Sequence, residues 1–202
     1  GTEIKGVDVE IMNLVGEKLG KKIEFVNVEF SAIIDNVKAG EVCDAGAAGI
    51  TITAERSEEV DFSIPYSSTE QYIILKADNN AIANLGDLNG KKIGVQQGTT
   101  SDFLVSGLIA DAALTGAELT PYDAPSLAAA ALGTKIDAVV TDKLTAEVIV
   151  ASSNGAYKTF KLVNADGSDV AEVEMYGVAV EKGNTELLNA INEVLTELLA
   201  DG

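Results

Sequence analysis

Residues 47–56 carry the sequence Ala47-Ala48-Gly49-Ile50-Thr51-Ile52-Thr53-Ala54-Glu55-Arg56. The small and apolar residues that run from Val42 to Ile50 predict a buried strand. Thr53 suits the N-cap of a helix in which Arg56 is the third residue. A buried strand is therefore expected to end where a helix begins, beside a permanently charged guanidinium.

A guanidinium in this position suits an anionic partner. Its planar fork binds a carboxylate through two parallel hydrogen bonds, and threonine hydroxyls and backbone N–H groups nearby would add donors. The alternative is a surface salt bridge from Arg56 to Glu55, Glu58 or Glu59, and the local sequence alone favours it. A second charged strand end changes this balance.

The second strand end is predicted by the sequence Ile136-Asp137-Ala138-Val139-Val140-Thr141-Asp142. It is another short buried strand, and it ends in a negative charge. Open α/β sheets bind ligands beyond the carboxyl ends of their strands. Arg56 and Asp142, at two such ends, would together recognise a zwitterion, and the pair suits an α-amino acid.

Helical and strand patterns alternate along the chain and predict an α/β protein with two halves. In the first half we expect helices at 7–19 and 30–39 and strands at 23–28, 42–50 and 71–76. In the second half we expect strands at 92–96, 118–122 and 136–142 and helices at 100–114, 126–132 and 144–152. A strand at 173–180 and a final helix that opens at Asn184 would return to the first half. Two crossings, near 68–72 and 174–176, predict a hinge between lobes at 1–69 with 175–202 and at 70–174.

Composition and charge narrow the function classes. The 202 residues are 47% hydrophobic, enough to bury a core, and no stretch is apolar enough to span a bilayer. A formal charge of −18 argues against nucleic acid and anionic lipid as partners. The absence of histidine and the single Cys43, which suits a small core position, argue against zinc sites and imidazole-dependent nucleophiles. Carboxylate sites for hard metals stay possible, but the acidic residues are scattered without the spacing of a calcium loop, so we expect a solvated acidic face and no metal site.

A glycine turn between the two charged strand ends has the sequence Gly94-Val95-Gln96-Gln97-Gly98-Thr99-Thr100-Ser101-Asp102. It lacks the lysine of a phosphate-binding loop and the spacing of a dinucleotide fingerprint. Free N–H groups at the start of the following helix would attract a carboxylate. The alternative is an ordinary helix cap, and Thr99 or Thr100 could serve as one while also contacting a ligand.

Several segments together make the chain resemble the extracytoplasmic solute-binding proteins of the polar amino-acid family, family 3, which are receptors of ABC importers. The resemblance rests on 6–10, on 48–56 with 60–66, on 94–100, on 137–142 and on 176–180. It implies an α/β fold of the type II periplasmic-binding-protein class, with two lobes joined by two crossover strands. It also implies a bacterial, extracytoplasmic receptor, periplasmic or lipid-anchored, that closes on an amino acid, delivers it to the membrane permease subunits and needs no cofactor.

The resemblance implies a role for each candidate residue. Arg56, the Thr51 hydroxyl or amide and the Gly49 backbone would hold the α-carboxylate from one lobe. Thr100, with Thr99 beside it, would add a contact from the other lobe, and Asp142 would bind the α-ammonium.

Two further side chains are candidates for selecting the ligand. Phe30 stands where relatives often carry an aromatic that packs on the ligand, although a core or capping aromatic is an equal alternative. Gln96 stands where relatives vary with substrate. Glu172 and Glu174 alternate with apolar residues, which is typical of the solvent face of a strand rather than of catalytic acids.

Compared with the family pattern, the sequence begins after the usual first strand and ends before the usual C-terminal tail. A missing central strand would expose a sheet edge, so we expect self-association or reduced affinity. Two other functions stay open: a cyclohexadienyl-type dehydratase, which would need a further acid in the cleft, and the ligand-sensing domain of a receptor.

Overall fold

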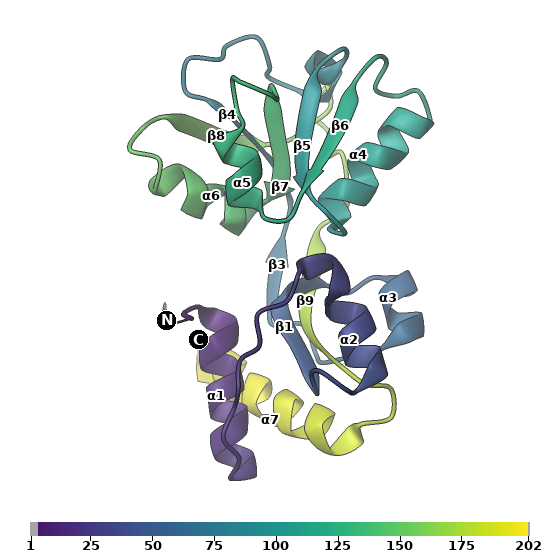
Figure 1. The fold of residues 1–202 in the computed structure, drawn as a ribbon, viewed down its shortest axis with the longest axis vertical. Coiled ribbons are helices and arrows are strands. Elements are labelled where there is room, and N and C mark those ends of the chain that lie inside the picture. Colours follow the sequence, from purple (N-terminus) through teal and green to yellow (C-terminus); the bar gives the residue numbers. More distant parts are fainter. Residues whose placement is uncertain (1–3, 202) are drawn as a thin grey trace. The chain divides into compact units, whose positions relative to one another are not determined.

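The computed structural model describes residues 4–201, and the chain divides into two compact units. Unit 1 runs to Ser68 and resumes at Glu174, and unit 2 spans Thr69–Val173. The lobe bounds expected from the sequence differ from these by one residue at each crossing. Each unit has its own sheet and its own helices (Figure 1).

Unit 2 is built on a mixed five-stranded sheet with the order β6-β5-β7-β4-β8. Its strands are β4 (Gln71–Lys76), β5 (Lys92–Gln96), β6 (Glu118–Tyr122), β7 (Ala138–Asp142) and β8 (Tyr157–Lys161). Strand β5 runs parallel to β6 and β7, whereas β4 runs antiparallel to β7 and β8. The carboxyl ends of β5 and β7 therefore meet at the same edge, where β4 begins.

Helices cover both faces of the unit 2 sheet, because apolar side chains on its central strands point alternately to the two sides. Ile73 and Leu75 of β4 pack in one core cluster with Val105 of α4 (Thr100–Ala110). Ile74 packs in a second cluster with Ala146 of α6 (Lys143–Ala151) and with α5 (Pro125–Ala130). A 3-10 turn, η2 (Leu85–Leu88), contributes two leucines to the first cluster.

Unit 1 has a smaller sheet in which β9 (Glu174–Val180) lies between β1 (Ala45–Thr51) and β2 (Asp61–Phe62). Both neighbours run antiparallel to β9, and the short strand β3 (Ser67–Thr69) also pairs with it. Strand β9 is the segment that returns from unit 2. The sheet that carries β1 is therefore held together by residues more than a hundred positions away.

Successive side chains of β9 point to opposite faces of the unit 1 sheet, so the core of this unit has two parts. Val178 and Val180 pack with α1 (Val7–Leu19) and α7 (Thr185–Asp201). Ala179 faces the other side, toward Ile33 and Val37 of α2 (Ile33–Ala39), which follows the turn η1 (Phe30–Ala32). Helix α3 (Ala54–Glu59) leads from β1 to β2.

A bulge interrupts β1 just before the predicted site. The four steps from Gly46 to Ile50 oppose only the two steps from Ala179 to Gly177 on β9. Gly49 lies within this bulge at φ 59°, a left-handed conformation that glycine adopts without steric cost. The bulge re-aims the end of β1, which carries Thr51 and leads into α3.

Several predicted elements need correction. Residues 23–28 form no strand, because their backbone pairs with no neighbouring strand, although Ile23 packs against α1. Strand β1 begins at Ala45, so Cys43 lies before it and is half-buried. The sequence patterns missed β8, and the predicted helix at 100–114 ends at Ala110. Within the described residues, no helix has the length and apolarity to cross a membrane.

Ile73 lies in the core of unit 2. Ile73→Ala removes a side chain that is 0% exposed, so we expect the free energy of unfolding to fall by about 2–5 kcal/mol. Urea unfolding followed by circular dichroism measures it. Val148→Ala, at a position that is 66% exposed, is the control and should change it by less than about 0.5 kcal/mol. Equal losses in the two variants would contradict this account of the core.

Candidate functional site

Arg56 is the only arginine in the sequence, and it is buried with 9% of its surface exposed. It lies in α3, whose N-cap Thr53 accepts a hydrogen bond from the Arg56 backbone N–H (3.2 Å). The cap fixes the first turn of the helix directly after β1. The guanidinium is thereby held beside the end of that strand, as the sequence predicted.

Two contacts of the guanidinium lie within unit 1. Its Nη1 donates to the backbone carbonyl of Thr51 (2.8 Å), and its central carbon lies 5.8 Å from the centre of the Phe30 ring. A cation at this distance over an aromatic face is attracted to it. Phe30 also packs against the cluster that contains Ile33 and Val37, so it contacts both the core and the guanidinium.

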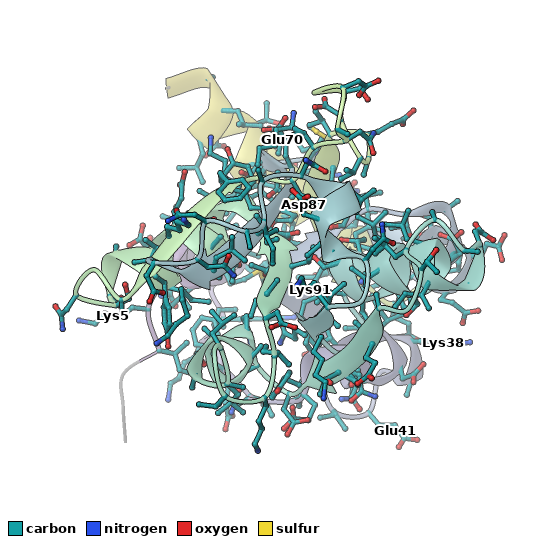
Figure 2. All side chains as sticks on the ribbon, turned by 90° about the horizontal axis from the view of Figure 1, so that it is seen from above. Lys5, Lys38, Glu41, Glu70, Asp87 and Lys91 are labelled. Carbon is teal, nitrogen blue, oxygen red and sulfur yellow. The ribbon has the colours of Figure 1, made fainter. Side chains whose placement is uncertain are left out.

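The alternative of a surface salt bridge does not fit the burial of Arg56. Glu55 and Glu58 are exposed, and Glu59 pairs with Lys38. Lys38 and Glu41 extend outward at the end of α2 (Figure 2). Pairs of this kind are solvated and contribute little to stability, which sets them apart from the buried guanidinium.

Thr51 contacts the carboxylate of Glu174, which the sequence patterns predict to face solvent. The threonine is 5% exposed, and its hydroxyl donates to Oε2 of Glu174 (2.7 Å). Glu172 is exposed as predicted, but Glu174 is half-buried, so its assignment to a solvent face is wrong. Pairing of β9 with β1 puts Glu174 beside the strand end, a long-range contact that alternation along the sequence does not reveal.

Gly49 is held by a second acidic residue that the sequence analysis missed. Its backbone N–H donates to Oδ2 of Asp8 (3.1 Å), and the Tyr66 hydroxyl donates to the other oxygen of Asp8 (2.5 Å). The ring of Tyr176 lies against Gly49, 3.5 Å from where a Cβ would stand. The tyrosine rings of 66 and 176 are 6.3 Å apart. This network fixes the bulge of β1 from the first turn of α1.

The electrostatics of this network favour a neutral tyrosine. Burial raises the pKa of the Tyr66 hydroxyl far above its ordinary value, and the charge of Asp8 and the hydrogen bond to it raise it further. The hydroxyl therefore keeps its proton and donates it to Asp8 throughout the physiological range.

In unit 2, Asp142 and Thr100 come together around one buried glutamine. Asp142 is the last residue of β7, and Gln71 lies directly opposite it on β4. The Gln71 amide donates to Oδ1 of Asp142 (3.3 Å) and to the Thr100 hydroxyl (3.5 Å). The Ser101 hydroxyl donates to the carbonyl oxygen of the same amide (2.6 Å).

The two remaining candidates of unit 2 have local partners. Thr99 is the N-cap of α4: it accepts from the Asp102 N–H (3.2 Å) and donates to the Gln96 carbonyl (2.8 Å). The side-chain amide of Gln96 donates to the backbone carbonyl of Asp123 (3.1 Å). Thr99 thus has the structural role that the sequence analysis gave as an alternative, and its contact with ligand stays a prediction.

Each unit therefore gathers its own part of the predicted site. Unit 1 brings Arg56, Thr51 and Phe30 together, with Gly49 in the adjoining bulge. Unit 2 brings Asp142 and Thr100 together. The sequence analysis missed Asp8, Tyr66, Glu174, Gln71 and Ser101 as site residues. Among these five residues, only Gln71 could have been found from the sequence, because it is a polar residue at one end of an apolar strand.

Comparison with known proteins shows both the fold class and the protein family of this chain. The fold is that of the type II periplasmic binding proteins, as its structural neighbours establish. The family model of bacterial extracellular solute-binding proteins, family 3, matches residues 1–202, and the chain belongs to this family.

Three similar proteins illustrate the relationship. The L-arginine-binding protein of Pseudomonas aeruginosa is 31% identical over 202 residues, which are 99% of this chain and 76% of that protein. An ancestral arginine-binding protein bound to arginine is 40% identical, with a TM-score of 0.85 over 99% of this chain and 84% of that one. The structure of an ancestral arginine-binding protein bound to glutamine is 39% identical, with a TM-score of 0.84 over the same shares.

The Tyr66–Asp8 contact yields a prediction about stability and pH. Tyr66→Phe removes a hydrogen bond to a carboxylate, so the free energy of unfolding should fall by about 1–3 kcal/mol at pH 7. Because folding raises the pKa of Tyr66 above its ordinary value of 10.0, its contribution is complete below pH 10 and is lost as the pH rises further. The difference between wild type and variant should therefore shrink above pH 10.

Urea unfolding at pH 7 and at a series of pH values above 10 measures this difference. Tyr157→Phe, at a half-buried tyrosine of unit 2, is the matched control. A difference between wild type and Tyr66→Phe that stays constant, or grows, in alkali would refute the proposed role of the Tyr66 proton.

Proposed function

We propose that this protein binds a free amino acid outside the bacterial cell and delivers it to the membrane permease subunits of an ABC importer. The observation that carries the proposal is the buried, sole arginine, which lies in α3 and contacts the last residue of β1. Such a group provides a bidentate partner for a carboxylate. Unit 2 offers the complementary charge, Asp142, at the end of β7.

In unit 1 we assign the α-carboxylate to Arg56 and Thr51, with Phe30 packing on the ligand. The Thr51 hydroxyl has one proton, which it donates to Glu174 in this structure. A ligand carboxylate that accepts a hydrogen bond from this hydroxyl has to replace Glu174. Otherwise the ligand carboxylate has to bind the backbone amide of Thr51. Likewise, a ligand oxygen at the Gly49 amide has to replace Asp8.

In unit 2 we assign the α-ammonium to Asp142 and a carboxylate contact to Thr100, supported by Thr99. Gln96 is the candidate for reading the ligand side chain. Its amide can accept as well as donate, so a ligand group with either capacity finds a partner there.

The ligand is expected to be a polar or charged amino acid. The relatives named above carry arginine and glutamine, whose side chains end in nitrogen-bearing planar groups. The negative charge of the whole chain does not decide this, because it describes the surface rather than the site.

Capture and release would follow from the two-unit architecture. A ligand that contacts both charged strand ends binds the closed arrangement more tightly than the open one, so binding shifts the population toward closure. We propose that no bond is made or broken, and that the ligand is recovered unchanged. Export, either to the periplasm or to a lipid anchor on the outer face of the membrane, belongs to the same proposal.

Arg56→Ala is the direct test of the carboxylate assignment. Calorimetric titration of the wild type with the standard amino acids should give saturable binding of one chemical group of them. We expect the variant to lose about 2–5 kcal/mol of binding free energy, because a desolvated charge pair is broken. Lys22→Ala, at an exposed cation of unit 1, is the matched control and should bind as the wild type does.

The single arginine permits an independent readout. Phenylglyoxal, an arginine-selective reagent, has one target in this sequence, and a saturating amino acid should slow its reaction. Unchanged binding by Arg56→Ala, or modification that is equally fast with and without ligand, would overturn the assignment.

Self-association is a separate prediction. Strand β1 is the terminal strand of its sheet in the described part of unit 1, and an unpaired edge can accept a strand from another chain. Sedimentation analysis over a range of concentrations should detect a dimer in equilibrium with monomer. A single monomeric species at every concentration would contradict it.

A further inference from the structure

Gln71 occupies an unusual position for a polar side chain. It begins β4, in the sheet of unit 2, and only 3% of its surface is exposed. Burying an amide is unfavourable unless its donors and acceptor are satisfied. The partners that satisfy it therefore indicate what the residue does.

These partners come from two different elements. Asp142 lies on the neighbouring strand β7, while Thr100 and Ser101 form the start of α4. The geometry also fixes which end of the amide faces which partner. A carboxylate only accepts hydrogen bonds, so the NH2 group must point to Asp142. The carbonyl oxygen then accepts from Ser101, which is itself 2% exposed.

The consequence for Asp142 is a preferred orientation. The terminal torsion of an aspartate is broad, so a carboxylate at a strand end has no single direction of its own. A donor held on one oxygen, Oδ1, restricts this rotation and sets the direction of Oδ2. The donor is held in turn, because Ser101 anchors the opposite end of the same rigid amide.

We propose that Gln71 is a positioning residue for ligand recognition by unit 2. It holds the Asp142 carboxylate, and more weakly the Thr100 hydroxyl, in the directions that a ligand ammonium and carboxylate require. Being buried, it acts through these two side chains rather than by touching the ligand. The inference rests on the proposed function, since Asp142 and Thr100 are ligand contacts only if the protein binds an amino acid.

The test compares a ligand with and without its α-ammonium. Gln71→Leu removes the amide and nearly keeps the volume. We expect its affinity for L-arginine to fall about tenfold to a hundredfold, which is the size of the effect when a hydrogen bond to a charged group is lost. Its affinity for 5-guanidinopentanoate, the same molecule without the α-ammonium, should change far less, because Asp142 has no partner on that ligand.

Two further variants complete the design. Asn80→Leu replaces an exposed amide of unit 2 outside the turn at 94–102 and should leave both affinities unchanged. Ser101→Ala releases the amide without adding apolar volume, so it should weaken L-arginine binding in the same direction but by less. It also keeps the test decisive if Gln71→Leu does not fold, which thermal unfolding reveals.

The outcomes separate the two proposals. If the wild type binds none of the standard amino acids, the proposed function fails, and the inference fails with it. If it binds another amino acid instead of L-arginine, that amino acid and its analogue without the α-ammonium replace the two ligands in the test. If the wild type binds L-arginine but the variants bind it equally well, Gln71 is not a positioning residue and the proposed function stands. Equal losses for L-arginine and 5-guanidinopentanoate would assign Gln71 a purely structural role.

Discussion

A guanidinium that leaves water loses hydration worth several kcal/mol, so a protein that buries one has to supply strong partners. Unit 1 supplies two such partners near the end of β1. The Thr51 carbonyl accepts from Arg56, the Phe30 ring lies near the cation, and the Thr53 cap fixes the helix that carries it. The bulge before Thr51 is held in turn by Asp8. The arrangement of unit 1 around β1 can be understood as support for one buried charge.

Unit 2 has a negative charge at a strand end, and a neutral side chain binds it. Its carboxylate, Asp142, is half-buried and lies at the end of a strand between apolar layers. A neutral amide, Gln71, binds it without adding a counter-charge. If Asp142 binds an ammonium, as proposed, a cation in the place of Gln71 would compete with that ammonium, whereas the neutral amide donates a hydrogen bond without adding a positive charge. This difference is why a glutamine suits the position.

Local patterns predicted much of the secondary structure. Strands β4, β5 and β6 and helix α1 have the predicted bounds, because apolar periodicity and capping residues are properties of neighbouring positions. The two main failures have different causes. Residues 23–28 have a strand-like composition, but a strand exists only where a partner pairs with it. In β8 every residue is half-buried, so it lacks the alternation of core and solvent positions on which such predictions depend.

The candidate site likewise combines residues that the sequence predicts with contacts that only the tertiary structure shows. By itself the sequence determined the two α/β halves, the charges of Arg56 and Asp142 near two strand ends, and a helix cap at Thr99 or Thr100, because each follows from the residues next to it. Only the tertiary structure decided that Glu174 reaches Thr51, that Asp8 holds Gly49, and that Gln71 joins Asp142 to the start of α4. These contacts join positions 29 to 123 residues apart. Strand pairing and packing bring these positions together, and no local sequence pattern specifies either.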